Sequence, residues 1–347
     1  MNKSVFLLPV AALLAACGSN SGGGGGGESS SIKIVGSSTV YPFTTTVAEQ
    51  FQRANPGTNV IVESTGTGAG MKLFCSGVGS NTPDVSNASR RIKAGELEDC
   101  HENGVKNVVE IPVGIDGLTI IQSVNAPPLN LTQEDVYKAL AANPYGQGPN
   151  QAQTWKDVNP SLPARKIRVL GPPPTSGTRD SLVELYMEKG CDANAQMKAL
   201  KASDSDKHKD ICTKIREDGA FVEAGENDNL IVQKVAQDTE ALGVLGFSFL
   251  DENADRVKPV SVNGVAPTEE TISSLQYPGA RKIFIYVKGE HLQAKPSIRE
   301  FVQTYARMWS KGGALERRGL VPLGEADASA ATTQATELTS LDPASLN

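Results

Sequence analysis

Histidine is scarce in this sequence, and the three that occur, His101, His208 and His291, are scattered along the chain. No Cys-x-x-Cys pair is present, so the usual spacing of a zinc site is missing. The sequence also lacks the Gly-x-Gly-x-x-Gly fingerprint of dinucleotide sites and the Gly-Lys-Ser/Thr of P-loops. We therefore expect no bound metal and no cofactor.

Positive charge and aromatic side chains are also in short supply. The formal net charge is −6, the pI is about 5.3, and aromatic residues make up 5% of the chain. Nucleic acids select basic surfaces and aromatic stacking platforms, so this composition argues against a nucleic-acid partner. Beyond the N-terminus no stretch is apolar enough to span a membrane.

The N-terminus has the pattern of an export signal. Lys3 precedes an apolar run over 5–16 that ends in Leu-Ala-Ala-Cys, with the cysteine at Cys17. We interpret 1–17 as a lipoprotein signal peptide and lipobox, with Cys17 as the lipidated residue; a generic signal peptide with a chance cysteine is the alternative. Residues 18–31, with six consecutive glycines, predict a flexible tether. The expected location is periplasmic, anchored to the membrane only by lipid.

Four cysteines remain after Cys17, an even number in a chain exported to an oxidising compartment. Proximity along the chain favours the disulfides Cys75–Cys100 and Cys191–Cys212 over the two other connectivities that four cysteines allow.

Short β-rich runs alternate with amphipathic segments along the rest of the chain, which predicts an α/β fold with helices on both faces of its sheets. Residues 41–55 and 132–141 read as helices, the second with Thr132 as its cap and Asp135 at the third position, and 108–113, 117–124 and 282–287 read as strands. The chain is longer than one core usually organises, so we expect two lobes.

Four turns rich in glycine and hydroxyl groups each lie between a strand and a helix, at 36–40, 64–70, 87–90 and 175–179. Unpaired backbone N–H groups and the positive end of the helix dipole favour an oxyanion at such a junction. A single turn of this kind is usually an ordinary helix cap, but four in one chain predict an anion site.

At these turns the sequence resembles the periplasmic phosphate-binding proteins of bacterial ABC importers, which have the type-2 periplasmic-binding-protein fold. The matching segments are GSSTVYP (36–42), GTGAG (66–70), DVSNASR (84–90), DGLT (116–119), SGT (176–178) and ENDN (226–229). The resemblance implies a lobe 1 of residues 32–117 plus 247–347, a lobe 2 of 118–246, and hinge strands at 117–124 and 243–249. It also implies a monomer that delivers phosphate to the membrane permease subunits.

The resemblance further implies which groups hold the ligand between the lobes. From lobe 1 these are Ser38, Thr39, the Val40 amide and Thr67. From lobe 2 they are Ser176, Gly177 and Thr178.

Two positions depart from the family pattern. Ser89 stands where an aspartate accepts the ligand's proton, and Pro172 stands where an arginine binds the anion. Arg90 and Arg179 are candidates to restore the positive charge, with ordinary salt bridges as the alternative. Asp116 is a candidate for the missing carboxylate, with Asp180 and Asp228 as competitors and a turn cap as its other explanation. Asn229 is a further candidate ligand, although an asparagine at a helix start is more often a cap.

The sequence therefore predicts a non-enzymatic receptor with high affinity for inorganic phosphate. A receptor for another tetrahedral oxyanion such as sulfate stays open. Hydrogen phosphate carries a proton and needs one acceptor, whereas sulfate needs donors only. A secreted phosphoester hydrolase is less favoured, because a metal cluster or a nucleophile with a positioned base is missing.

Overall fold

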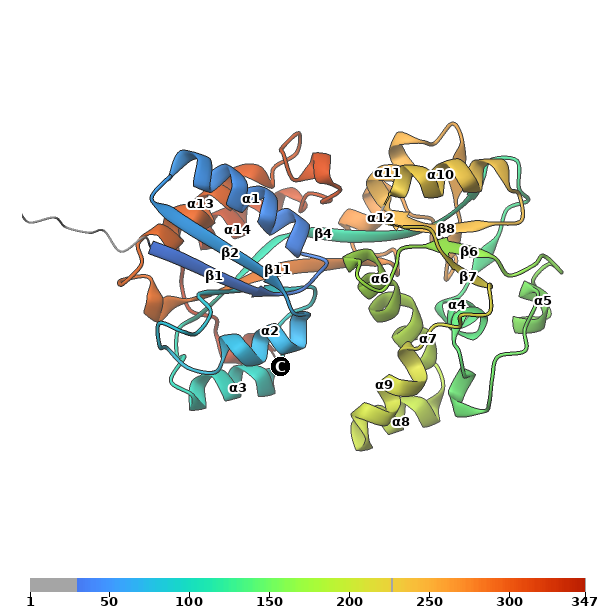
Figure 1. The fold of residues 1–347 in the computed structure, drawn as a ribbon, viewed down its shortest axis with the longest axis horizontal. Helices are drawn as coiled ribbons and strands as arrows, with labels where there is room; N and C mark the ends of the chain where they lie inside the picture. The colour runs from blue at the N-terminus through green and yellow to red at the C-terminus, as the bar shows by residue number, and fades with distance from the viewer. Residues whose placement is uncertain (1–29, 226, 347) are drawn as a thin grey trace, which may run out of the picture.

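The computed structural model describes residues 30–225 and 227–346, which form two lobes joined by long strands (Figure 1). The predicted signal peptide and Cys17 lie outside these residues, so the lipid anchor stays a prediction. The predicted tether at 18–31 extends too far, because Ser30 and Ser31 are already part of a strand and pair with Thr58 and Asn59. Across the described residues, no helix combines the length and apolar character needed to cross a membrane.

Lobe 1, on the left of Figure 1, is assembled from both ends of the chain. Strands β1 (Ser30–Gly36), β2 (Thr58–Ser64) and β3 (Val85–Ala88) are parallel, and β11 (Ala280–Lys288) is antiparallel to β3. The helices and 3₁₀ turns of this lobe are α1 (Tyr41–Ala54), α2 (Thr67–Phe74), α3 (Ala94–Glu102), η3 (Gly289–His291), α13 (Ser297–Met308), η4 (Glu316–Arg318), α14 (Glu325–Glu337) and η5 (Pro343–Leu346).

Lobe 2, on the right of Figure 1, contains the middle of the chain. Its strands are β5 (Asn130–Leu131), β6 (Val169–Gly171), β7 (Phe221–Glu223), β8 (Leu242–Gly246), β9 (Val257–Pro259) and β10 (Ser261–Val262). Its helices and turns are α4 (Gln133–Leu140), η1 (Pro144–Gly146), α5 (Trp155–Val158), α6 (Gly177–Leu182), the π-helical turn η2 (Val183–Met187), α7 (Glu188–Cys191), α8 (Ala195–Ser203), α9 (Ser205–Thr213), α10 (Asp228–Gln237), α11 (Phe247–Glu252) and α12 (Glu269–Ser273).

One strand, β4 (Val108–Ser123), passes through both lobes. Its first part pairs antiparallel with β11, and its last part pairs with β8 and β9. The sheet order is therefore β2-β1-β3-β11-β4-β8-β6-β7, with β9 beside β4. The α/β fold is as predicted, whereas the two strands predicted at 108–113 and 117–124 are one, because β11 pairs with β4 from 108 through 117 and so spans the predicted gap.

The predicted second hinge strand at 243–249 is wrong. Strand β8 ends at Gly246 and the chain turns at once into helix α11, so it does not reach lobe 1. Residues after 247 stay with lobe 2, where β9 pairs with β4 and β10 pairs with β5. The chain returns at β11, whose Ala280 pairs with Gly117, so the second segment of lobe 1 begins near 280 and not at 247.

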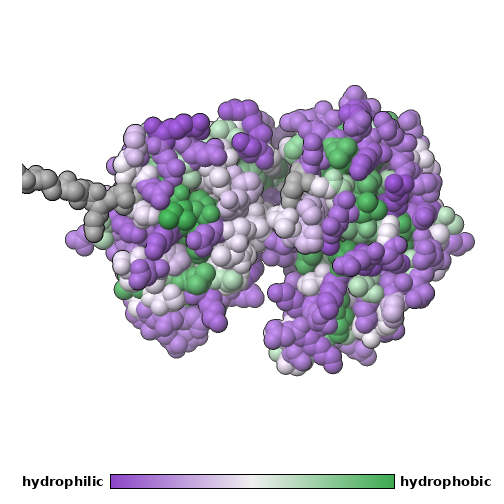
Figure 2. Space-filling view, in the orientation of Figure 1, coloured by the Kyte–Doolittle hydropathy of each residue, from purple (hydrophilic) through white to green (hydrophobic). Residues whose placement is uncertain are grey.

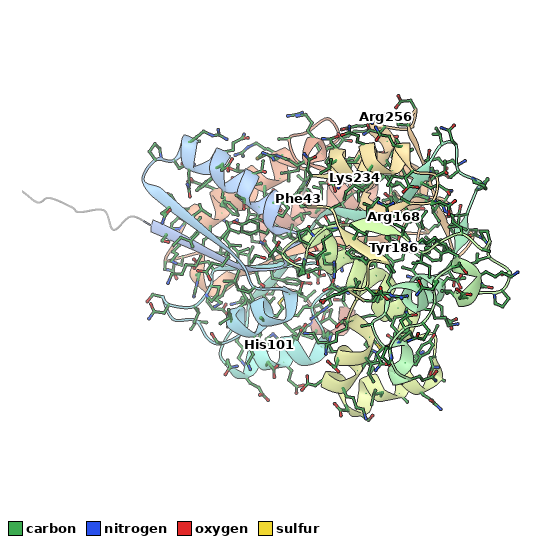
Figure 3. The ribbon with its side chains drawn as sticks, turned by 45° about the vertical axis from the view of Figure 1, so that its right-hand side comes forward. Phe43, His101, Arg168, Tyr186, Lys234 and Arg256 are labelled. Carbon is green, nitrogen blue, oxygen red and sulfur yellow. A yellow bond between two sulfur atoms is a disulfide. The ribbon has the colours of Figure 1, made fainter. Side chains whose placement is uncertain are left out.

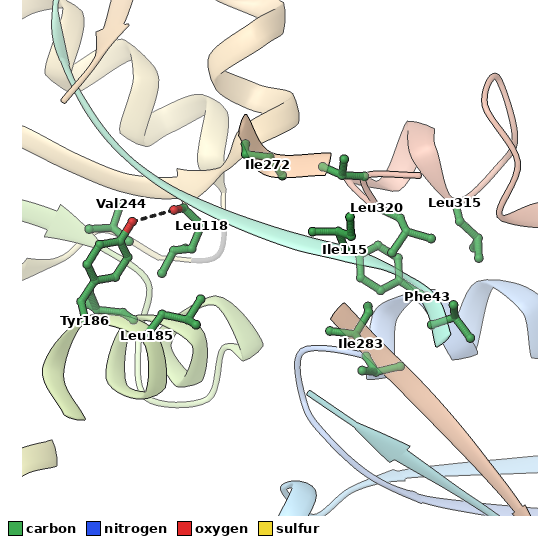
Figure 4. Packing of buried hydrophobic residues seen from close by; sticks show 14 of the residues in the cluster. Phe43, Ile115, Leu118, Leu185, Tyr186, Val244, Ile272, Ile283, Leu315 and Leu320 are labelled. Atoms are coloured by element: carbon green, nitrogen blue, oxygen red, sulfur yellow. Dashed lines mark hydrogen bonds between the residues drawn. The ribbon is translucent and has the colours of Figure 1, made fainter. Parts of the chain in front are cut away.

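The two crossing strands are packed among buried side chains (Figure 4). Ile115 and Leu118 of β4 belong to the same apolar cluster as Ile283 of β11. The buried Tyr186 hydroxyl donates to the Leu118 carbonyl over 2.8 Å, which ties η2 to the hinge. Because the core continues across the hinge, the strands that join the lobes hold a defined geometry.

Helix ends follow local chemistry. Thr132 caps α4 by accepting a hydrogen bond from the Asp135 amide over 3.0 Å, while the Asp135 carboxylate accepts from the Thr132 amide over 2.8 Å. This is the reciprocal cap expected from the sequence. Both favoured disulfides, Cys75–Cys100 and Cys191–Cys212, are present.

Candidate functional site

The first and fourth hydroxyl-rich turns meet between the lobes. The first connects β1 to α1, and the fourth opens α6. Thr39 Oγ1 donates to the Gly177 carbonyl over 3.1 Å, and Ser38 Oγ donates to the Asp180 carboxylate. Two segments that lie almost 140 residues apart in the sequence therefore form one polar wall.

A cavity of about 810 Å³ opens at this contact, where Figure 2 shows the two lobes facing each other. Six of the predicted site residues line it: Ser38, Thr39, Asp116, Ser176, Gly177 and Thr178. Ser176 caps α6 by accepting a hydrogen bond from the Thr178 amide over 3.2 Å, which leaves its hydroxyl hydrogen able to donate. The cavity is thus lined by hydroxyl groups from both lobes.

Gly177 allows the two turns to come this close. A Cβ at this position would lie 2.5 Å from the Ser38 carbonyl oxygen and 2.7 Å from the Thr39 amide nitrogen. Any larger residue would have to push the lobes apart.

We expect Gly177→Ala to weaken ligand binding by about 1–3 kcal/mol, roughly five- to 150-fold, since overpacking a close contact costs about that much. Calorimetry measures the affinity, and small-angle scattering should show a more open liganded form. Gly68→Ala is the matched control, because a Cβ there meets nothing within 4 Å. Equal affinities for both variants would contradict this reason for glycine at 177.

The second and third turns form a separate, buried pair of hydroxyls in lobe 1. Thr67 and Ser89 hydroxyl oxygens are 2.9 Å apart, and the Ser89 amide donates to Thr67 Oγ1 over 3.1 Å. Ser89 Oγ donates to the Glu184 carboxylate of lobe 2 over 3.0 Å. A carboxylate from the π-helical turn η2 therefore reaches the position where the family has an aspartate.

Arg281 joins these groups, and sequence reasoning missed it. Its guanidinium donates to Ser181 Oγ over 2.9 Å, to Thr39 Oγ1 over 3.3 Å and to the Asp116 carboxylate over 3.2 Å, and it also pairs with Glu184. The side chain is only 12% exposed. No local motif marks this arginine; its one signal is the pairing of Arg281 with Asp116 across β11 and β4, which places both side chains on one face.

Asp116 uses one carboxylate oxygen to hold its neighbours. Oδ2 accepts hydrogen bonds from Ser181 Oγ over 2.7 Å and from Arg281 Nε over 3.2 Å. Within the described residues Oδ1 has no hydrogen-bond partner, and Asp116 lines the cavity. Asp116 can therefore orient Arg281 and still accept a proton from a ligand.

Around Arg281 there are more acidic groups than cations, because Asp116, Asp180 and Glu184 lie near this one guanidinium. Burial raises the pKa of Asp180, and the negative charge of Glu184 adds to the rise against the lowering effect of the Ser38 hydrogen bond. A carboxyl that takes up a proton more readily than usual reduces the negative charge beside an anion.

Arg90 and Arg179, the predicted replacements for the lost arginine, have other partners. Arg90 makes a two-pronged ion pair with Glu96, with N–O distances of 2.7 and 2.9 Å, and this pairing raises the pKa of Arg90. Arg179 donates to the Pro172 carbonyl over 3.1 Å and lies 4.4 Å above the Phe221 ring. Neither lines the cavity, because each is held by its own lobe.

Asn229 is exposed in the first turn of α10 and also does not line the cavity. The capping role in this helix belongs to Asn227, whose side chain accepts from the Leu230 amide. Val40 is fully buried at the start of α1, behind the hydroxyl groups. Neither of these two predicted positions, Asn229 and Val40, therefore lines the cavity.

Comparison with known proteins agrees with this architecture. The model of the PBP superfamily domain matches residues 21–307. Protein SphX of Synechococcus elongatus is 32% identical over 96% of this chain and 88% of its own length, and the phosphate-binding protein PstS of Staphylococcus saprophyticus is 30% identical over 91% and 87%. A crystal structure of a possible phosphate binding protein from Planctomyces limnophilus superposes with a TM-score of 0.72 at 28% identity, covering 89% of this chain and 98% of that one. The chain therefore belongs to the PBP superfamily, in the family that includes these SphX and PstS proteins.

Proposed function

We propose that the cavity between the lobes binds inorganic phosphate and that the protein delivers it to the permease subunits of an ABC importer. The observation that carries this proposal is that hydroxyl groups from both lobes line one cavity together with Asp116, whose carboxylate pairs with the buried Arg281 through one oxygen and keeps the other for a ligand. Ser38, Thr39, Ser176 and Thr178 supply the hydroxyls. Charge-assisted hydrogen bonds from such donors are strong where water is excluded.

The arrangement also suits the protonation state of the ligand. Arg281 and the hydroxyls donate to ligand oxygens, while Asp116 Oδ1 accepts the proton that hydrogen phosphate still carries. Asp180 and Glu184 are weaker candidates for this role, because neither lines the cavity, whereas the competitor Asp228 does line it. The relatives support phosphate as well, since PstS is named as a phosphate-binding protein.

Titration calorimetry of the purified protein with phosphate, arsenate and sulfate tests the function. We expect tight binding of phosphate and arsenate, which both carry a proton near neutral pH, and weak binding of sulfate. Tighter binding of sulfate than of phosphate would show that the protein is a receptor for another tetrahedral oxyanion. A phosphate-ester turnover assay should show no product, in keeping with a binding protein.

Asp116→Asn separates the two oxyanion classes. An amide places an N–H donor beside the ligand hydroxyl, so phosphate affinity should fall by about 1.5–3 kcal/mol, at least tenfold, while sulfate affinity rises. Calorimetry at one pH and ionic strength measures both constants. Unchanged affinities for both anions would show that another carboxylate accepts the proton, and Asp180→Asn and Glu184→Gln would identify it.

We further propose a monomeric receptor in the periplasm that is anchored to the membrane by lipid. The apolar run before Cys17 supports the anchor. Mass spectrometry of the mature N-terminus should find Cys17 as the first residue with an attached lipid. A Cys17 without lipid, whether or not the signal peptide has been removed, would exclude the anchor. Size-exclusion chromatography with light scattering measures the oligomeric state.

A further inference from the structure

Helix α9 is fastened to lobe 2 by two side chains. It buries only His208 and Cys212, which lie one turn apart and so point to the same face. Cys191, at the end of α7, forms a disulfide with Cys212. The neighbouring helix α8 buries only Met197, and Figure 1 shows α7, α8 and α9 together at one end of the lobe. Besides the half-buried Leu200 and Ile211, this helical hairpin therefore has little apolar surface packed on the core, and the disulfide adds a covalent link.

The same three side chains form a compact group of metal-binding atoms. Ligand atoms of Cys191, His208 and Cys212 all lie within 4.8 Å of one another, and all three residues are buried. Asp192 Oδ1 is 2.7 Å from His208 Nε2. Within residues 30–225 and 227–346 no other three such groups come as close, and His101 does not complete a group with the neighbouring Cys75–Cys100 pair.

We propose that this group binds a zinc ion when the Cys191–Cys212 disulfide is reduced. Two thiolates and one imidazole are a common set of zinc ligands, with water or a further side chain in the fourth position. Asp192 holds one nitrogen of the His208 ring and orients the imidazole, as carboxylates beside metal-bound histidines do. The disulfide and the metal exclude each other, because the thiolate is the ligand form of cysteine.

A phosphine reduces the Cys191–Cys212 disulfide. Two electrons and two protons convert the disulfide into two thiols, and the phosphine becomes a phosphine oxide with an oxygen atom from water. Zinc then displaces both thiol protons into the buffer. The ion replaces the covalent cross-link, so a chain whose cysteines are still reduced keeps the α8–α9 hairpin docked.

The test uses the full chain, reduced with a phosphine without oxygen and titrated with Co²⁺ as a spectroscopic probe. We expect a thiolate-to-cobalt charge-transfer band that saturates at one ion per chain and disappears when Zn²⁺ is added. The oxidised protein should give no band. A reduced parent without this band would overturn the proposal.

Matched variants locate the ion. The double substitution Cys75→Ser and Cys100→Ser should keep the band, and Cys191→Ser with Cys212→Ser should remove it; the opposite result would place the ion at the other pair. His208→Gln should weaken Co²⁺ binding at least tenfold, and unchanged binding would exclude the imidazole. Thermal unfolding gives an independent readout on the unmodified sequence: Zn²⁺ should raise the Tm of the reduced protein and leave that of the oxidised protein unchanged.

Discussion

Arg281→Ala is expected to remove measurable phosphate binding while leaving the protein folded. Truncating one partner of a buried, hydrogen-bonded charge pair costs about 2–5 kcal/mol, roughly 30-fold to several thousandfold in affinity. The loss should lie at the upper end, because Asp116 and Glu184 would both lose the cation that pairs with them. Calorimetry with phosphate measures the effect, and circular dichroism checks the fold.

Two further variants show whether the guanidinium acts on the ligand. Arg281→Lys keeps the charge but loses the planar set of donors, so its affinity should be intermediate. Arg168→Ala is the surface control: this arginine is 49% exposed and pairs with Asp238 on lobe 2 (Figure 3). Parent-like affinity in Arg281→Ala would mean that the cavity binds its anion without this side chain.

Asp84→Asn is expected to have the largest effect on stability. The Asp84 side chain is fully buried in lobe 1 and accepts hydrogen bonds from the Lys33 amide over 2.8 Å and from Lys295 Nζ over 2.9 Å. His291 Nδ1 lies 2.6 Å from Oδ1 of the Asp84 carboxylate. Removing the charge leaves Lys295 without its counterion, which costs about 3–5 kcal/mol in the free energy of unfolding. Urea unfolding measures the loss.

The surface pair Asp210–Lys214 supplies the matched control. Asp210 is 64% exposed, so Asp210→Asn should change the unfolding free energy by less than about 1 kcal/mol. Similar urea midpoints for the two aspartate variants would show that the buried ion pair contributes no more than a surface pair.

The same carboxyl predicts a dependence on pH. Burial alone would raise the pKa of Asp84, but hydrogen bonds from His291, Lys33 and Lys295 outweigh it and lower the pKa. Because deprotonation then favours folding, the stabilisation is complete above the unfolded-state pKa of about 3.9 and is lost as the pH falls through the folded-state value. The stability difference between parent and Asp84→Asn should shrink on acidification, and a difference that grew at low pH would contradict this sign.

Lys288 lies near Asp84 and is also buried. Its Nζ donates to the Gly77 carbonyl over 2.6 Å and to Thr82 Oγ1 over 2.8 Å. Burial lowers the pKa of Lys288 to about 8. The loop at 77–82 is thus fastened to β11 by a buried cation. Nothing in the local sequence around Lys288 indicated this role.

The order of helices and strands followed closely from the sequence, because hydrophobic period and helix caps are local properties. Helix α1 begins at Tyr41 as predicted, and Thr132 caps α4 as predicted. The hydroxyl-rich turns were equally visible, since their glycines and hydroxyls are contiguous. The lobe boundary at 247 was misplaced because Phe247 lies in an apolar run that suits a strand as well as a helix, and only packing selects the helix.

The sequence by itself determined the α/β fold, the two disulfides, the family and the hydroxyl groups that line the cavity, because each depends on residues close together or on a recognisable segment. Tertiary structure alone decided which charges stand beside those hydroxyls. Arg281 reaches Asp116 across 165 residues and Glu184 across 97. These contacts depend on the pairing of β11 with β4 and on the π-helical turn η2, and a single arginine in an unremarkable segment carries no local sign of either.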